Sequence, residues 1–231
     1  MATLSQHQHI FLQAMMAHKV MRYDKARQMH FEIINDGNIK PGATYNSSQR
    51  GGNDDGREFD KFWSQVARAL SFLDLDLRRV RWPEDNQLYI GVINKTGGET
   101  AKLATKLTPE QIALFRVVLD EILKDDRNAS LGVDVMAVLN ATQLWSQAAA
   151  AGPSQPNATQ ELTQEQQESV AKMTKVEKEQ TLRKLCVDGW LKQGDDDAGK
   201  LRLGVRSFLE LRDYLLNAAP LQAREKWENM L

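Results

Sequence analysis

The chain contains little of what most enzymes and secreted proteins use. Among its 231 residues are a single cysteine, Cys186, and four histidines, all within the first 30 positions. One cysteine cannot form an internal disulfide, which fits a reducing intracellular compartment. His7 and His9 are two positions apart and therefore lie on different faces of a helix, whereas a helical zinc pair needs a spacing of three or four. We expect no disulfide framework, no cofactor and no metal site in this chain, and we interpret Cys186 as a buried structural thiol.

Long apolar runs and catalytic motifs are also missing. No run approaches the ~20 apolar residues that cross a bilayer, so no membrane partner is expected. Gln and His interrupt the N-terminal segment, which is unlike a signal peptide. The sequence contains no GxSxG, no HExxH and no glycine loop of the kind that holds phosphate. A binding or structural role remains the best interpretation.

The charge balance excludes a general attraction to nucleic acid. Lys and Arg number 30 and Asp and Glu number 31, for a formal net charge of -1. The content of 42% hydrophobic and 26% charged residues is typical of a globular protein. Because the whole molecule has no basic field, any contact with nucleic acid must come from a local patch of Lys and Arg.

The first half of the sequence shows three helical patterns. Apolar spacing predicts helices over residues 6–21, with Ile10, Phe11, Ala14, Met15 and His18 on one face, and over residues 23–35. Residues 36–57 are rich in Gly, Asn, Asp and Ser, which predicts a long loop. The strongest helical period follows, with its apolar positions at Phe59, Phe62, Trp63, Val66, Ala69, Leu70 and Leu73.

A hairpin completes this half. Residues 75–82 and 88–94 read as strands, joined by a turn at Pro83-Glu84-Asp85-Asn86. Three helices followed by a β-hairpin is the order of a winged-helix unit. The alternative is a generic small α+β domain.

The second half repeats this order. Thr108, Pro109 and Gln111 form a capping-box arrangement at the start of a helix. A second helix is predicted over residues 130–150, and a third begins at Thr174 with Glu177 at its third position. After a Gly-Pro break and a polar Gln/Glu stretch between these two helices, the third helix leads into a hairpin through residues 190–203. A closing helix is predicted over residues 205–217.

These patterns predict a fold class that is mainly α with small β-hairpins, an α+β fold of tandem winged-helix domains. The predicted boundaries are 1–97 for the first domain, 98–220 for the second, and 221–231 for a tail. Trp227 lies in this tail, where the sequence shows no core for it to enter.

The third helix of a winged unit is where DNA-binding members place their base contacts. In the second half, the expected outward row of this helix is Glu177, Gln180, Lys184 and Asp188, which is mixed in sign, and the hairpin beside it is acidic at 195–197. That surface is a poor match for phosphate.

The first half offers a better candidate for weak DNA contact. Arg78, Arg79 and Arg81 crowd one predicted strand, and Arg68 lies on the helix before it. A solvated strand face is the favoured alternative for these four arginines.

Several segments together resemble a known family. They are the strand at 89–94, the KLATKL stretch at 102–107, the helix at 111–123, and two C-terminal segments at 178–191 and 203–215. With these segments in the same order and spacing, the chain resembles the non-SMC element 1 subunit of the SMC five–six chromosome complex from about Gln8 to Pro220.

The resemblance implies two winged-helix domains followed by a RING-like zinc domain, in a nuclear ubiquitin ligase subunit. It further implies a MAGE-type winged-helix partner, a kleisin partner, and roles in DNA repair, DNA recombination and the response to DNA damage. The residues after Pro220, LQAREKWENML, contain no Cys or His, so the family's zinc ligands have no positions in this sequence. We expect this chain alone to hold no zinc and to be inactive as a ligase.

Two rival hypotheses remain beside this one. The first is a winged-helix regulator that binds specific DNA sequences, which a basic recognition helix would favour. The second is an adaptor in an unrelated complex.

Overall fold

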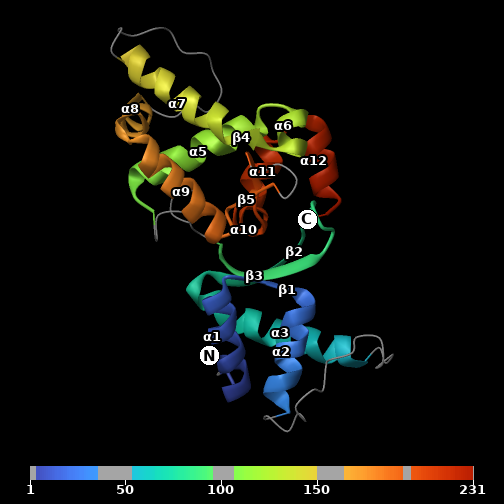
Figure 1. The fold of residues 1–231 in the computed structure, drawn as a ribbon. Coiled ribbons are helices and arrows are strands. Elements are labelled where there is room, and N and C mark those ends of the chain that lie inside the picture. Colours follow the sequence, from blue (N-terminus) through green and yellow to red (C-terminus); the bar gives the residue numbers. More distant parts are fainter. Residues whose placement is uncertain (1–3, 36–53, 96–106, 150–163, 195–198, 231) are drawn as a thin grey trace. The chain divides into compact units, whose positions relative to one another are not determined.

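The chain folds as two compact units, Met1–Thr96 and Gly97–Met230. The computed structural model describes residues 4–35, 54–95, 107–149, 164–194 and 199–230 (Figure 1). Each unit combines helices with one antiparallel sheet of three strands. The predicted fold class, mainly α with small β-hairpins, is confirmed. No helix in the described part of the chain is long and apolar enough to cross a membrane.

The first unit places a short strand between its first two helices. Its elements are α1 (Gln6–His18), β1 (Val20–Arg22), α2 (Tyr23–Ile34), α3 (Asp54–Leu70), a 3-10 turn η1 (Ser71–Leu73), β2 (Leu75–Arg81) and β3 (Leu88–Asn94). The sheet order is β1-β3-β2, so β3 is central and pairs antiparallel with both neighbours. The three helices cover one face of this sheet (Figure 1).

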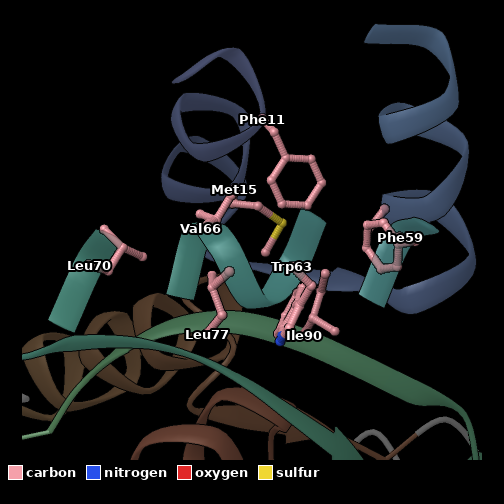
Figure 2. Packing of buried hydrophobic residues seen from close by; sticks show 9 residues of the cluster. Phe11, Met15, Phe59, Trp63, Val66, Leu70, Leu77 and Ile90 are labelled. Carbon is pink, nitrogen blue, oxygen red and sulfur yellow. The ribbon is translucent and has the colours of Figure 1, made fainter. Parts of the chain in front are cut away.

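Aromatic side chains dominate the core between these helices and the sheet. The ring of Phe11 on α1 meets those of Phe59 and Phe62 on α3 edge to face, at centroid distances of 6.0 and 5.2 Å. Leu77 and Ile90 reach this cluster from the sheet (Figure 2). Edge-to-face pairs of this kind stabilise a core by about 0.5–1.5 kcal/mol beyond simple burial.

The end of α1 differs from the sequence prediction. The helix ends at His18, because Lys19 adopts a φ of 62°, and residues predicted to be helical up to Met21 instead form β1. Ile10 and His18, expected on the inner face, are exposed. Gln8 is buried in their place, and its Nε2 donates to Oε1 of Gln65 at 2.7 Å. Pairing with β3 and this buried amide contact both depend on residues far along the chain.

The second unit repeats the arrangement with additional helices. Its elements are α5 (Pro109–Leu123), α6 (Asp126–Leu131), β4 (Val133–Asp134), α7 (Val135–Ala149), α8 (Gln164–Lys172), α9 (Lys175–Val187), β5 (Leu191–Gln193), β6 (Lys200–Leu203), α10 (Val205–Glu210), α11 (Arg212–Ala218) and α12 (Leu221–Glu228). Here the sheet order is β4-β6-β5. The strand between the helices therefore again pairs with the last strand of the hairpin.

Both predicted capping boxes of this unit are confirmed. The hydroxyl of Thr108 accepts from the backbone N–H of Gln111, whose side chain accepts from the backbone N–H of Thr108. Thr174 and Glu177 form the same reciprocal pair at the start of α9. Caps of this kind contribute about 1 kcal/mol each. The helix α5 that follows the first cap is buried along most of its length and forms the centre of the second unit.

The helix predicted over residues 130–150 is interrupted. Gly132 ends α6 with a φ of 81°, and β4 separates it from α7. A Cβ at Gly132 would lie 2.5 Å from the carbonyl oxygen of Leu201 on β6, so a side chain there would push the two strands apart. The predicted closing helix is likewise divided at Leu211 into α10 and α11, and part of the polar Gln/Glu stretch forms α8.

The prediction that Trp227 has no core to enter is wrong. Residues 221–228 form α12, and Trp227 is only 3% exposed. Its ring meets Phe208 of α10 edge to face at 5.2 Å. The backbone N–H of Ala223 also donates to Oδ1 of Asp126 at 2.9 Å. The segment expected to be a tail is therefore packed into the second unit.

We predict that Trp227→Ala lowers the free energy of unfolding of the second unit by about 3–5 kcal/mol, because a large buried ring is removed without collapse of its site. Urea unfolding followed by circular dichroism measures this. Trp227→Phe keeps an aromatic partner for Phe208, and we expect it to lower the free energy of unfolding clearly less than Trp227→Ala does. Equal, small losses for both variants would contradict the packing described here.

Candidate functional site

The arginine-bearing strand β2 directs its charges to two different faces. Successive side chains on a strand alternate, and Arg79 lies on the face covered by the helices. Its guanidinium is 5.0 Å from the ring centre of Tyr23 and 4.7 Å from that of Trp63. Its Nη2 donates to Oδ1 of Asp60 at 2.6 Å. Arg79 is thus held by an aromatic pair and a carboxylate of its own unit.

The other predicted DNA-contact residues do not converge with Arg79. Arg78 lies on the opposite face of β2 and is half-buried. Arg81 is exposed, and its Nη1 donates to the backbone carbonyl of Asn86 in the hairpin turn at 3.0 Å. Arg68 projects from α3 and is exposed. Contact of these four arginines with DNA stays a prediction, but the structure does not gather them into one patch.

We predict that Arg79→Ala destabilises the first unit by about 1–2 kcal/mol, since it removes two cation–π contacts and a partly exposed ion pair. Arg81→Ala, an exposed change of equal charge, is expected to cost less than ~0.5 kcal/mol. Denaturant titration of both variants makes the comparison. If the two variants lost the same free energy of unfolding, the stacking of Arg79 on Tyr23 and Trp63 would not contribute to stability.

A buried histidine lies in the same aromatic core. His30 of α2 is 6% exposed, and its ring lies 5.2 Å from that of Phe59 and 4.4 Å from that of Phe62. Its Nε2 has no hydrogen-bond partner among the described residues. Burial, together with the charge of Arg27, lowers the pKa of His30 from 6.5 to about 4. The imidazole is therefore neutral at physiological pH.

This lowered pKa predicts a specific acid sensitivity. Protonation favours the unfolded chain wherever the folded pKa is the lower one. The free energy of unfolding is therefore not reduced by His30 above pH 6.5. It decreases as the pH falls from 6.5 to about 4, by at most about 3 kcal/mol. Unfolding titrations across this range test it. His30→Leu should flatten the decline, whereas His18→Gln, at an exposed position, should not. A decline unchanged in His30→Leu would refute the assignment.

The outer face of α9 differs in part from the predicted row. Glu177 and Gln180 are exposed, but Lys184 is half-buried and its Nζ donates to Oε1 of Gln111 at 3.4 Å. Val176 and Val187 are 62% and 87% exposed instead. This face presents two valine side chains with one exposed arginine, Arg183, between them, rather than the clustered Lys and Arg that phosphate binding needs. The acidic segment at 195–197 lies outside the described residues.

An apolar tip projects from the first unit at the end of α3. Phe72 and Leu73, neighbours in η1, are 68% and 54% exposed. Asp74 follows them with a φ of 55° and turns the chain into β2. Exposed hydrophobic residues that stand singly are ordinary, but a phenylalanine beside a leucine forms a local patch suited to protein contact.

Two reactive groups of α9 are held inside the second unit. Lys178 is 5% exposed, and its Nζ donates to Oγ1 of Thr142 at 3.2 Å; burial lowers the pKa of this amine. Cys186 is half-buried, and burial raises the pKa of its thiol, which disfavours the nucleophilic thiolate. Among the described residues, no group of three or more His, Cys, Asp and Glu side chains could hold a metal ion. The expectation of a zinc-free chain stays a prediction.

Comparison with known proteins identifies the family. Residues 8–211 match the family model described as the Nse1 non-SMC component of the SMC5-6 complex. The chain belongs to this family, as the sequence resemblance predicted. None of the curated proteins matches it.

A solved structure shares the fold. A chain of the structure described as the Nse1-Nse3-Nse4 complex superimposes with a TM-score of 0.63 and 22% sequence identity. The match covers 94% of this chain and 76% of that chain.

Proposed function

We propose that this protein is a structural and interaction subunit of the SMC5-6 complex that binds a MAGE-type winged-helix subunit, Nse3, and a kleisin subunit, Nse4. The observation that carries the proposal is the family match over residues 8–211. The fold shared with a chain of the Nse1-Nse3-Nse4 complex supports the choice of partners. In this role the protein acts in the nucleus, in DNA repair and chromosome maintenance.

The proposal includes a winged-helix identity for both units. In the first unit, a helix, a short strand, two helices and a hairpin follow one another, and the short strand pairs with the last strand of the hairpin. The second unit has the same sheet order, with α6 and α8 inserted before β4 and α9. This shared order supports tandem winged-helix domains over residues 1–97 and 98–220, with α12 packed onto the second.

The alternative, a regulator that reads DNA sequence, has less support. A reader of this kind needs cations on its recognition helix and wing. The outer face of α9 presents Val176 and Val187. The turn of the first hairpin carries Glu84 and Asp85, both exposed. These carboxylates repel phosphate, so we propose that the isolated chain binds DNA only weakly.

The exposed tip of Phe72 and Leu73 is the protein contact that we propose for the first unit. An aromatic residue beside an aliphatic one is the composition typical of the buried centre of an interface, where a few residues supply most of the binding energy. Because this tip protrudes from the end of α3, a partner can enclose it without rearrangement of the core.

We predict that the chain forms a stable complex with the MAGE-type partner and that Phe72→Ser with Leu73→Ser weakens it at least about tenfold, because the loss of one anchor of ~1.4 kcal/mol already gives that factor. Isothermal titration calorimetry measures the affinity.

The matched control is Val176→Ser with Val187→Ser, which removes two exposed apolar residues from α9 and should leave the affinity unchanged. Loss of binding only in the control would move the interface to the second unit. Failure of the wild-type chain to bind any MAGE-type protein would leave the hypothesis of an adaptor in an unrelated complex.

A further inference from the structure

One face of α3 carries basic residues at helical spacing. Arg57, Lys61, Ser64 and Arg68 are separated by four, three and four positions, so they form one row along the helix. Arg57, Lys61, Ser64 and Arg68 are all exposed. The row lies opposite the apolar face that carries Phe59, Trp63, Val66 and Leu70 into the core. At 1.5 Å per residue it extends for roughly 16 Å.

The positive charges of this row are available to a partner. Neither Arg57 nor Lys61 forms an ion pair with any side chain that the structure describes, a set that does not include the side chains of Asp54 and Asp55. Arg68 makes only a long contact, from its Nε to the backbone carbonyl of Ser64 at 3.4 Å.

Carboxylates border the row on both sides, and Asp54, the first residue of α3, stands three positions before Arg57 on the same face of the helix. Asp60 lies at one edge, and its charge is used by Arg79 at 2.6 Å. Glu58 lies at the other edge of the row.

The surroundings of the row distinguish it from the other surfaces of the chain. Residues 1–96 contain 13 Lys and Arg against 11 Asp and Glu, a net charge of +2, while residues 97–231 contain 17 against 20, a net charge of -3. The corresponding helix of the second unit, α9, exposes Val176 and Val187 on its outer face. The row with three cations therefore belongs to α3 and to the more basic half of the chain.

We propose that the Arg57–Lys61–Arg68 row of α3 is a contact surface for the phosphate backbone of duplex DNA. Arg57 and Lys61 are spaced by about 6 Å along the helix, and Lys61 and Arg68 by roughly 10 Å with Ser64 between them, so one side of the helix can contact several phosphates of a strand. The row holds Arg, Lys and Ser, the side chains that commonly contact phosphate oxygens, and contacts to phosphate carry no sequence information directly. The contact is therefore independent of sequence and sensitive to salt.

This surface differs from the arginine strand considered first. Arg79 is occupied by Tyr23, Trp63 and Asp60, and Arg78 lies on the opposite face of β2. Of the four arginines in that group, Arg68 alone belongs to the row. The carboxylates of Glu84 and Asp85 in the hairpin turn repel phosphate. The proposed DNA contact is therefore made by the helix α3 and not by the hairpin.

The experiment titrates the 231-residue chain onto a short labelled duplex at several salt concentrations and follows fluorescence anisotropy. Three phosphate contacts predict that log K falls against log salt with a slope of about -2.7, at ~0.9 for each contact. Lys61→Ala with Arg68→Ala should reduce the slope to about -0.9 and weaken binding roughly tenfold at about 50 mM salt. Ser64→Lys, which adds a cation inside the row, should tighten binding and steepen the slope, a gain that misfolding cannot produce.

The matched control is Lys175→Ala with Arg183→Ala on α9, which removes the same charge from exposed positions of the second unit. Binding by this control should equal that of the wild-type chain. Equal losses in the two double variants would show that only net charge matters and would overturn the proposal. So would the absence of any duplex binding by the wild-type chain at about 50 mM salt. Displacement of the duplex by polyglutamate of matched charge would assign the row to acidic protein segments instead.

Discussion

Each unit depends on the pairing of a short strand with a hairpin that lies far along the sequence. Val20–Arg22 pairs with β3, and Val133–Asp134 pairs with β6. A two-stranded hairpin alone is only marginally stable in water. The added strand widens the sheet to three strands. In sequence it lies between α1 and α2 in the first unit and between α6 and α7 in the second. The helices of the first unit then cover one sheet face, and the core of Phe11, Phe59 and Leu77 forms between them.

The two units also stabilise their cores with the same kind of contact. In the first, the guanidinium of Arg79 lies over Trp63 and pairs with Asp60; in the second, that of Arg206 lies 4.2 Å from the ring centre of Trp190 and pairs with Glu210 at 2.6 Å. A guanidinium can satisfy a carboxylate in its own plane while its flat face rests on an indole. Arginine content alone is consequently a poor guide to nucleic-acid binding in this chain.

The remaining surfaces suggest a division of roles along the chain. The first unit carries both the basic row of α3 and the apolar tip at Phe72 and Leu73, which follow one another in the sequence. The second unit is more acidic, and of its reactive side chains Lys178 is buried and Cys186 is half-buried.

The sequence by itself determined the features that arise from local interactions. The capping boxes at Thr108 and Thr174 and the apolar period of α3 depend on residues a few positions apart, and the hairpin at 75–94 joins two strands that follow one another in sequence. The structure has all of these features. The family followed from several such segments in order. Tertiary structure decided what depends on distant residues: the strands β1 and β4, the inward direction of Arg79, the neutral His30 and the burial of Trp227. No local pattern marks Val20–Arg22 as a strand, because only the distant β3 satisfies its backbone hydrogen bonds. Trp227 likewise has no partner near it in sequence, and it enters a core only because Phe208 is brought to it by the fold.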